Sequence, residues 1–231
     1  KNNQLAYPHQ TSWGVSTRLI GGIIMTHGDD SGLVLPPRIA PVQAVVIPVA
    51  QHKEGVLEAA RGLYDRLQAA GVRVKIDESE QSPGWKFAEY EMRGVPVRVE
   101  IGPKDMEKDQ CCIARRDTGE KVFVPLAELE ETVKGLLDNI HDTLFARAKK
   151  NLEDNTFQVD GGWEEVKAVL EKNGGGFVKT KWCGSLDCEL AMKEKVGVTS
   201  RCMPLQQTES VGKCPVCGKE CETDIIWGVA Y

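Results

Sequence analysis

The sequence lacks any apolar stretch long enough to cross a membrane. Its longest apolar run, Ala44 to Ala50, is far shorter than the ~20 residues that a transmembrane helix needs. The opening residues Lys1 to Gln4 lead into no apolar signal-peptide region. We therefore expect neither a membrane-spanning nor a secreted protein, and we place the chain in the cytoplasm.

An excess of basic residues is also missing. The chain has 29 Lys and Arg against 34 Asp and Glu, for a net charge of −5. Such a balance argues against a protein that coats nucleic acid without specificity, although it leaves room for a local RNA site. At 231 residues and 41% apolar content, the chain is long enough for one to three globular domains.

Cysteine, by contrast, is plentiful and unevenly placed. Cys111 and Cys112 are adjacent on a predicted strand, where they point to opposite faces and are expected to be core and edge residues. The remaining six cysteines fall in the last fifty residues. Disulfides would require a secretory context that the sequence does not show, so clustered cysteines point first to a metal.

Two cysteine pairs have metal-ligand spacing. They are Cys183-Gly-Ser-Leu-Asp-Cys188 and Cys214-Pro-Val-Cys217, the second followed by a glycine. Together they predict one structural Zn²⁺ in a tetrahedral four-thiolate site. The alternatives are reduced, partly buried thiols or a redox pair. Cys202 and Cys221 have no histidine nearby and are interpreted as packing residues.

The middle of the chain alternates strand and helix signals. Strands are predicted by the β-branched or alternating runs, and helices by apolar residues at three- and four-residue steps. The predicted strands are 44–50, 72–76, 95–101, 110–115 and 121–124, and the predicted helices are 56–67, 83–94 and 126–145. This β-α-β-α-β-β-β-α order predicts a mixed α/β sheet with helices packed on it.

Composition suggests three parts. Residues 1–41 are rich in turn-forming residues, with helical potential over 16–26, and end in a proline-containing connector. Residues 42–153 hold the α/β pattern. Residues 154–231 form a smaller α+β unit with a short helix at 163–170, the cysteines and an apolar final strand at 225–231.

One more feature lies near the start, in Ser12-Trp-Gly-Val-Ser-Thr-Arg-Leu-Ile-Gly21. Read from the residues alone, it is a glycine-punctuated transition from strand to helix. The hydroxyls of Ser16 and Thr17 either cap the helix or bind a ligand, and Arg18 is either a surface residue or a group that holds a phosphate or a base.

This run resembles motif 3 of the prolyl-tRNA synthetase family, specifically the archaeal/eukaryote-like type with a C-terminal zinc domain. The resemblance continues in the same order to the end of the chain. It includes His27-Gly-Asp-Asp30, Gly32-Leu-Val-Leu-Pro-Pro37, Ser82-Pro-Gly-Trp-Lys-Phe-Ala-Glu89, Gly94-Val-Pro-Val-Arg-Val-Glu-Ile-Gly-Pro103, both cysteine pairs and Tyr231.

The resemblance implies a class II aminoacyl-tRNA synthetase, which activates proline with ATP and Mg²⁺ and transfers it to tRNA(Pro). It implies that Arg18 is catalytic and holds ATP, that Ser16 contacts the nucleotide, and that Trp13 and Gly14 form the floor of the proline and adenylate pocket. Motifs 1 and 2 are not in the sequence. We therefore expect a portion of a homodimeric enzyme, inactive by itself.

The same resemblance makes residues 1–41 the end of the catalytic domain, 42–153 the anticodon-binding domain and 154–231 the zinc-binding domain. Between Gly71 and Pro125 the sequence has ten Lys and Arg against eleven Asp and Glu, so RNA contacts there would be local. The candidates are Lys86, Glu89, Arg98 and Lys104, with Trp85 as a stacking platform. The alternative for each charge is an ordinary surface role.

The end of the chain allows two interpretations. In one, it is an edge strand of the zinc domain with Trp227 in its core. In the other, suggested by the family, the strand carries Tyr231 towards the synthetase active site.

Two other functions compete with the synthetase hypothesis. The first is a non-catalytic tRNA-binding module or isolated C-terminal piece, which would have no reason to keep Arg18 in its Ser-Thr-Arg setting. The second is a zinc-ribbon adaptor, which would need basic residues around the cysteines where the sequence has acidic ones.

Overall fold

A computed structural model describes residue 5 and residues 7–229. The chain divides into two compact units, Lys1–Ala146 (unit 1) and Arg147–Tyr231 (unit 2). Within the described residues, the search for a helix with the length and apolarity of a membrane span found none.

In unit 1, residues 7–16 have no regular secondary structure, and the first helix is α1, Arg18–His27. The predicted helical potential over 16–26 is thereby confirmed. Thr17 stands at the N-cap without a side-chain capping bond, and the chain turns to extended backbone at Gly28. No residue of α1 is buried.

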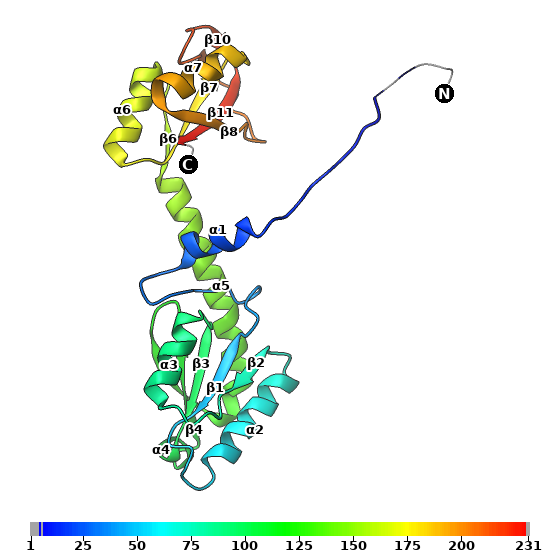
Figure 1. The fold of residues 1–231 in the computed structure, drawn as a ribbon, viewed down its shortest axis with the longest axis vertical. Helices are drawn as coiled ribbons and strands as arrows, with labels where there is room; N and C mark the ends of the chain where they lie inside the picture. Colours follow the sequence, from blue (N-terminus) through cyan, green and yellow to red (C-terminus); the bar gives the residue numbers. More distant parts are fainter. Residues whose placement is uncertain (1–4, 6, 230–231) are drawn as a thin grey trace. The chain divides into compact units, whose positions relative to one another are not determined.

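A five-stranded mixed sheet forms the body of unit 1, in the order β2-β1-β3-β4-β5 (Figure 1). Strands β1, β2 and β3 are parallel, whereas β4 and β5 follow as antiparallel hairpin strands. The strands are β1 Ala44–Pro48, β2 Val74–Ile76, β3 Val97–Ile101, β4 Gln110–Arg115 and β5 Lys121–Pro125. The predicted element order and mixed α/β class are confirmed.

The helices of unit 1 follow their sequence signals. Helix α2 buries the apolar face predicted for it, and Gly71, at φ 85°, provides the left-handed residue after its end. Helix α3 has Ser82 as N-cap, whose hydroxyl accepts from the Trp85 N–H, followed by a proline in the first turn. The helices are α2 Val56–Ala69, α3 Pro83–Met92, the one-turn α4 Pro103–Met106 and α5 Leu129–Asp154, which follows a 3₁₀ turn at Leu126–Glu128.

The two faces of this sheet are covered unequally. Helices α2 and α5 share one large apolar cluster with the inward residues of all five strands. On the other face, α3 packs Tyr90 over Val45 and Ile47 of β1. The part of that face formed by β3, β4 and β5 lies outside this apolar cluster, and we call it the open face: Glu100 and Cys112 are buried on it, but Phe123 is exposed.

Unit 2 contains a four-stranded sheet in the order β6-β7-β11-β8 and a short β9-β10 hairpin. Trp227 of β11 is fully buried, and its Nε1 donates to Thr180 Oγ1 at 2.9 Å. The elements are β6 Thr156–Gln158, α6 Trp163–Asn173, β7 Phe177–Trp182, α7 Leu186–Val196, β8 Val198–Cys202, β9 Gly212–Lys213, β10 Glu220–Cys221 and β11 Thr223–Val229.

The final strand corrects one expectation. Strand β11 pairs with β7 on one side and β8 on the other, so it lies inside the sheet and the edge-strand prediction is wrong. The prediction that Trp227 lies in the core of this unit is confirmed. Tyr231, the candidate C-terminal element, lies outside the described residues.

Candidate metal centre and nucleic-acid interface

The fold brings together the four cysteines of the two predicted pairs. The Sγ atoms of Cys183, Cys188, Cys214 and Cys217 all lie within 4.8 Å of one another. Cys183 follows the end of β7, Cys188 lies in the first turns of α7, and the other two occupy the turn between β9 and β10. These four residues therefore lie together and could hold a metal ion.

The turn that carries Cys214 and Cys217 is closed by its own backbone. The Cys214 N–H donates to the Lys219 carbonyl and the Gly218 N–H donates to the Cys214 carbonyl, both at 2.9 Å. Gly218 adopts φ 71°, a conformation that favours glycine. The Pro215 carbonyl accepts from the Trp163 N–H at 3.0 Å, which fixes the turn to α6.

The pKa values of the clustered thiols are shifted in opposite directions. Burial would raise the pKa of the Cys214 thiol, but the N–H groups of Cys217 and Val216 point at the sulfur and bring the pKa down to about 7. The pKa of Cys188 is raised, first by burial and then by the neighbouring thiols. Four thiols this close suit a tetrahedral ion with metal–sulfur bonds of ~2.3 Å, as in structural zinc sites.

The other four cysteines are not members of this cluster, although its thiols, after burial, help to raise the pKa of Cys221. Cys202 is exposed on β8 and Cys221 is half-buried on β10. Cys111 is buried in the core under α2 and α5, and Cys112 is buried on the opposite face of β4.

The open face of the unit 1 sheet carries charged and aromatic side chains in two cross-strand rows. The register places Arg98, Ala114 and Lys121 in one row and Glu100, Cys112 and Phe123 in the next. Phe123 is 65% exposed, an unusual setting for a phenylalanine on a sheet.

The charges on this face form a local network. Arg98 Nε donates to Glu100 Oε1 at 2.9 Å, and Lys121 Nζ lies 3.3 Å from the same oxygen. The Arg98 guanidinium lies 4.2 Å from the centre of the Phe87 ring of α3. This arrangement presents cations and π-faces side by side, which are the groups that bind phosphates and unstacked bases.

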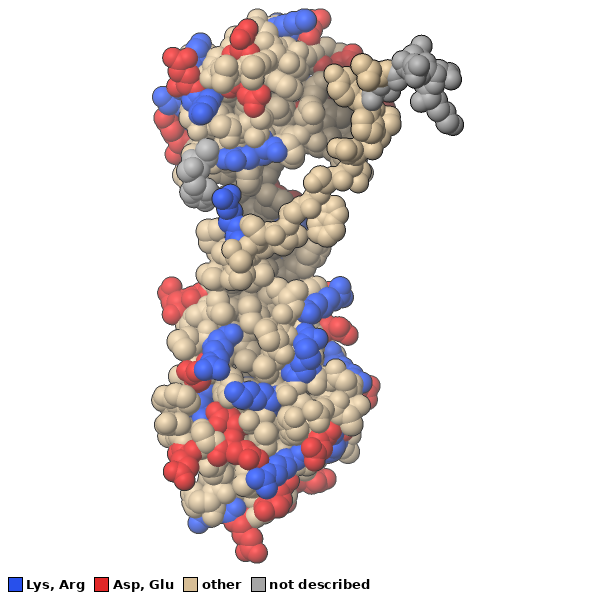
Figure 2. All heavy atoms as spheres, turned by 45° about the vertical axis from the view of Figure 1, so that its right-hand side comes forward, with Lys and Arg blue, Asp and Glu red and all other residues tan. Residues whose placement is uncertain are grey.

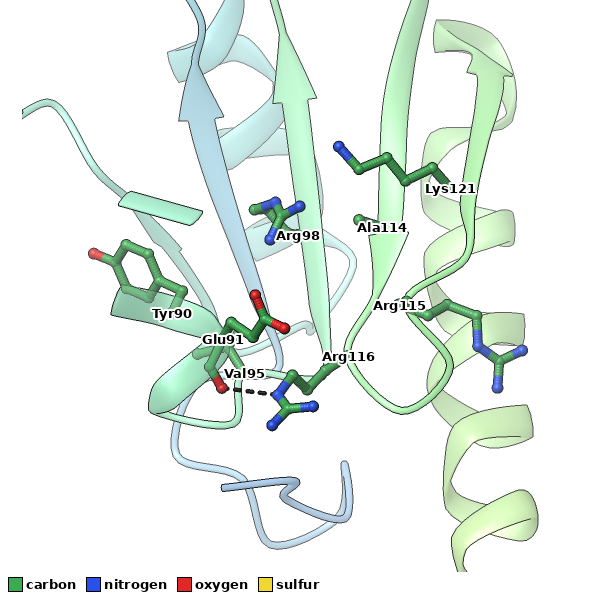
Figure 3. A pocket seen from close by; sticks show the side chains of 9 residues that line it. Tyr90, Glu91, Val95, Arg98, Ala114, Arg115, Arg116 and Lys121 are labelled. Carbon is green, nitrogen blue, oxygen red and sulfur yellow. Dashed lines mark hydrogen bonds between the residues drawn. The ribbon is translucent and has the colours of Figure 1, made fainter. Parts of the chain in front are cut away.

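Two depressions open on the same face. One, of about 230 Å³, lies between α3 and the β3-β4-β5 strands and is lined by Arg98, Arg116 and Lys121 among others (Figure 3). The second, of about 510 Å³, is lined by Lys104, Lys121 and Phe123 among others.

The structure separates the four predicted anticodon residues. Arg98 and Lys104 line these depressions. Lys86 is only 1% exposed, and its ammonium group donates to the Asp77 carbonyl at 2.8 Å and to Gln51 Oε1 at 3.1 Å. Because it is occupied inside unit 1, we leave it out of the proposed RNA interface.

Glu89 and Trp85 lie on α3. The Glu89 carboxylate is 2.5 Å from Arg93 Nη2, in a pair one helical turn apart, and Trp85 is 48% exposed. Sequence reasoning missed Lys121, Phe123 and Phe87. Strand register places Lys121 in the row of Arg98 and Phe123 in the next row, and the packing of α3 places Phe87 against Arg98.

Acidic and basic side chains alternate over unit 1. Figure 2 shows blue and red groups interspersed on this view of the molecule. An RNA partner would therefore be recognised by individual groups on the open face, as the charge count already suggested.

The predicted ATP and proline residues are all exposed. Trp13 is 88% exposed, and Gly14, Ser16 and Arg18 are likewise at the surface. Ser16 Oγ accepts from the Arg18 N–H at 3.3 Å, which is a local helix-start contact. On α1 the apolar side chains most open to solvent, at 60 to 76%, are Leu19, Ile20 and Met25.

Comparison with known families defines the class of protein. Residues 43–136, which hold the open-faced sheet, match the family described as "Anticodon binding domain". Residues 163–231, which hold the four-cysteine cluster, match the family described as "Prolyl-tRNA synthetase, C-terminal". The chain thus carries an anticodon-binding domain of the aminoacyl-tRNA synthetase kind.

Curated relatives agree with the second match. The chain is 52% identical over its full length to "Proline--tRNA ligase 2" of Bacillus thuringiensis (strain Al Hakam) and 55% identical to "Proline--tRNA ligase" of Ruminiclostridium cellulolyticum, covering 48% of each of these proteins. The chain belongs to the prolyl-tRNA synthetase family and spans about half the length of the curated relatives it matches.

Proposed function

We propose that this chain is the anticodon-reading and metal-binding portion of a cytoplasmic proline–tRNA ligase. The whole enzyme would activate proline with ATP and Mg²⁺ and transfer it to tRNA(Pro). The main support is that an anticodon-binding domain is joined in one chain to a prolyl-tRNA synthetase C-terminal domain. The division into residues 1–41, 42–153 and 154–231 is part of this proposal.

The open face of the sheet is the proposed anticodon site. Arg98, Lys104 and Lys121 would supply donors to base edges and phosphates, and Phe123 would stack on an unstacked base. Glu89 could accept from guanine N–H groups once its pair with Arg93 opens. Directional contacts of this kind fit a single-stranded loop better than a duplex.

The four-cysteine cluster would hold one Zn²⁺ with a structural role. Four protein thiolates fill a tetrahedral shell and leave no position for a water or a substrate. The metal would join β7, α7 and the β9-β10 turn at one point, in a unit with a small apolar core.

Residues 1–41 would complete a catalytic domain in the whole enzyme. Arg18 would hold ATP, Ser16 would contact the nucleotide, and Trp13 and Gly14 would form the pocket floor. The exposed apolar side chains of α1 support this, because an unpartnered apolar helix face normally packs against another surface. Tyr231 would approach the same pocket, and the whole enzyme would act as a homodimer.

The anticodon proposal is tested with the full-length enzyme and two tRNA(Pro) transcripts. One has the native anticodon, and the other has its final GG changed to CC. We expect the changed transcript to be charged at least ~10-fold less efficiently, since each lost base contact costs about 1–3 kcal/mol. Equal charging of both would show that this face does not read the bases.

The nucleotide proposal is tested by ATP–pyrophosphate exchange, which needs no tRNA. Arg18→Ala in the full-length enzyme should lower exchange by ~100-fold or more, because an electrostatic partner of the reacting phosphate is lost. Near-normal exchange would show that Arg18 is an ordinary surface residue at the start of the helix, without a role in holding ATP.

A further inference from the structure

One arginine connects the open sheet face with the segment that follows α1. Arg116 comes directly after β4, and its side chain is 6% exposed. Its Nε donates to the Glu91 carbonyl at 2.8 Å, and its two terminal nitrogens donate to the Asp29 carboxylate at 2.7 and 2.6 Å. These bonds hold the pKa of Asp29 below its ordinary value.

The segment that contains Asp29 is fixed to the end of α3 by its backbone. The Leu33 N–H donates to the Met92 carbonyl at 2.9 Å, and the Leu35 N–H donates to the Gly94 carbonyl at 3.2 Å. Together with Arg116, residues 29–35 and 92–94 form a contact that we call the joint.

Two glycines show how close the backbones are in the joint. Gly32 has φ 125°, and a Cβ there would lie 2.5 Å from the Met92 carbonyl oxygen. Gly94 has φ 71°, and a Cβ there would lie 2.6 Å from the Leu33 carbonyl oxygen. Neither position accommodates a side chain without movement of the backbone, so the joint has one well-defined geometry.

The joint lies between two proposed sites. Helix α1 ends at His27, two residues before Asp29, and it begins at Arg18. A helix of ten residues is about 15 Å long, so a small rotation at the joint displaces Arg18 considerably. On the other side, Arg116 lines the 230 Å³ depression, to which Glu91 and Arg98 also belong (Figure 3).

The guanidinium of Arg116 has more donors than the joint uses. A guanidinium has five N–H groups, and three are used in the joint. A phosphate or a base carbonyl in the depression would share the remaining two and so act on the same group that holds Asp29. Ligand occupancy and the position of the segment behind α1 would therefore be linked.

We infer that Arg116 is a positioning residue that couples occupancy of the sheet-face depression to the placement of α1 through Asp29. This inference rests on the proposed function, because it takes the depression as part of the RNA site and α1 as the carrier of a nucleotide-binding arginine. Arg116 acts through Asp29 and does not need to contact a reacting atom.

The neighbouring arginine provides a matched control. Arg115 donates from Nε and Nη2 to the Asp117 carboxylate and from Nη1 to Asn139 of α5. Arg115 also lines the 230 Å³ depression, but its side chain points towards α5, away from the joint (Figure 3). Arg115→Ala therefore removes an arginine–carboxylate pair at the same depression, with a more buried carboxylate, that does not contact residues 29–35.

The experiment measures kcat and KM of the full-length enzyme for native tRNA(Pro) and for the anticodon-altered transcript. The variants are Arg116→Ala, Asp29→Asn, the double variant and Arg115→Ala. The quantity compared is kcat/KM for the native transcript divided by kcat/KM for the altered one. We expect Arg116→Ala or Asp29→Asn to reduce this ratio by about fivefold, because kcat for the native tRNA falls. An effect of this size is typical of one partly exposed ion pair. The double variant should be no worse than either single one, and Arg115→Ala should keep the wild-type ratio.

Each contrary result has its own meaning. An equal loss of kcat/KM for both transcripts would show a structural role and overturn the inference. A rise in KM for Arg116→Ala that Asp29→Asn does not show would also overturn it, because it would mean that Arg116 only contacts the RNA directly. A wild-type enzyme with no preference between the transcripts instead overturns the proposed anticodon site. In the 231-residue chain, amide exchange at Leu33 and Leu35 should accelerate in both joint variants, and unchanged exchange would contradict the joint itself.

Discussion

The two units of this chain fix their folds by different means. Unit 1 places a five-stranded sheet against α2 and α5 and buries a large aliphatic cluster between them. Unit 2 is smaller, and its apolar cluster around Trp227 is correspondingly small. Because small units bury a smaller fraction of their surface, they depend more on individual strong interactions, and unit 2 contains two of them.

The first is the four-cysteine cluster and the second is a buried carboxylate. Asp224 on β11 is fully buried and has Lys181 Nζ at 2.9 Å and Lys179 Nζ at 3.0 Å. It also accepts from the Thr208 N–H at 2.7 Å. This contrast predicts that point changes should unfold unit 2 far more readily than unit 1.

Removal of the proposed metal should have the largest effect. Structural zinc contributes about 10–16 kcal/mol to the folding of small zinc-dependent peptides, which exceeds the stability of most domains. We expect a chelator, or Cys214→Ser, to abolish protection of residues 147–229 in limited proteolysis while residues 43–146 stay protected.

Cys202→Ser is the matched control, since Cys202 lies in the same unit but outside the cluster. It should keep about one zinc per chain by elemental analysis and normal protease resistance. If unit 2 stays folded in the presence of chelator, the cluster is a group of packed thiols, and unit 2 does not depend on a metal any more than unit 1 does.

Loss of the Asp224 charge should come next. Asp224→Asn leaves two lysines without their carboxylate, and breaking a buried ion pair costs about 3–5 kcal/mol. Burial opposes ionisation, but the Thr208 N–H and the two lysines keep the pKa of Asp224 well below its ordinary value of 3.8. The carboxylate therefore stabilises unit 2 above pH ~4, and this contribution is lost progressively as the pH falls below that value.

The measurement is the unfolding free energy of unit 2 in denaturant at pH 6, where the proposed metal stays bound, because thiol protonation in acid would release the metal and unfold both proteins. Asp224→Asn should lower this free energy by about 3–5 kcal/mol. A difference below about 1 kcal/mol would show that the hydrogen bonds of this side chain matter more than its charge.

The two units also differ in how much of their secondary structure could be predicted from the sequence. Unit 1 has clear alternation and helical periodicity, so its element order was predictable. Helix α5 runs to Asp154, beyond the predicted end at 145. The prediction stops short because the last turns of the helix are polar and exposed and have no apolar periodicity. In unit 2, β7 and α7 were not assigned. β7 contains Lys181, which is buried only because β11 brings Asp224 opposite to it.

The candidate sites show a similar division. The four cysteines were predictable, because thiolate spacing is a local signal of metal binding. Lys121 and Phe123 were not, because the turn at 117–119 predicts that β4 and β5 form a hairpin but not that β3, with Arg98, lies beside it. Lys86 was misleading, since a lysine buried against a main-chain carbonyl has the same sequence signature as an exposed one.

The smallest effect on stability should come from the open face of unit 1. Phe123 is 65% exposed and outside the apolar cluster, so Phe123→Ala should change the unfolding free energy by less than ~0.5 kcal/mol. Binding of a tRNA(Pro) anticodon stem-loop should nevertheless weaken by about 1–3 kcal/mol, the usual value of one stacked base. Val122→Ala is the control: Val122 is its 44% exposed neighbour on β5 and lines neither of the two depressions described here. If Phe123→Ala lowers stability and leaves RNA binding intact, this ring belongs to the packing of unit 1, and the proposed interface has to exclude it.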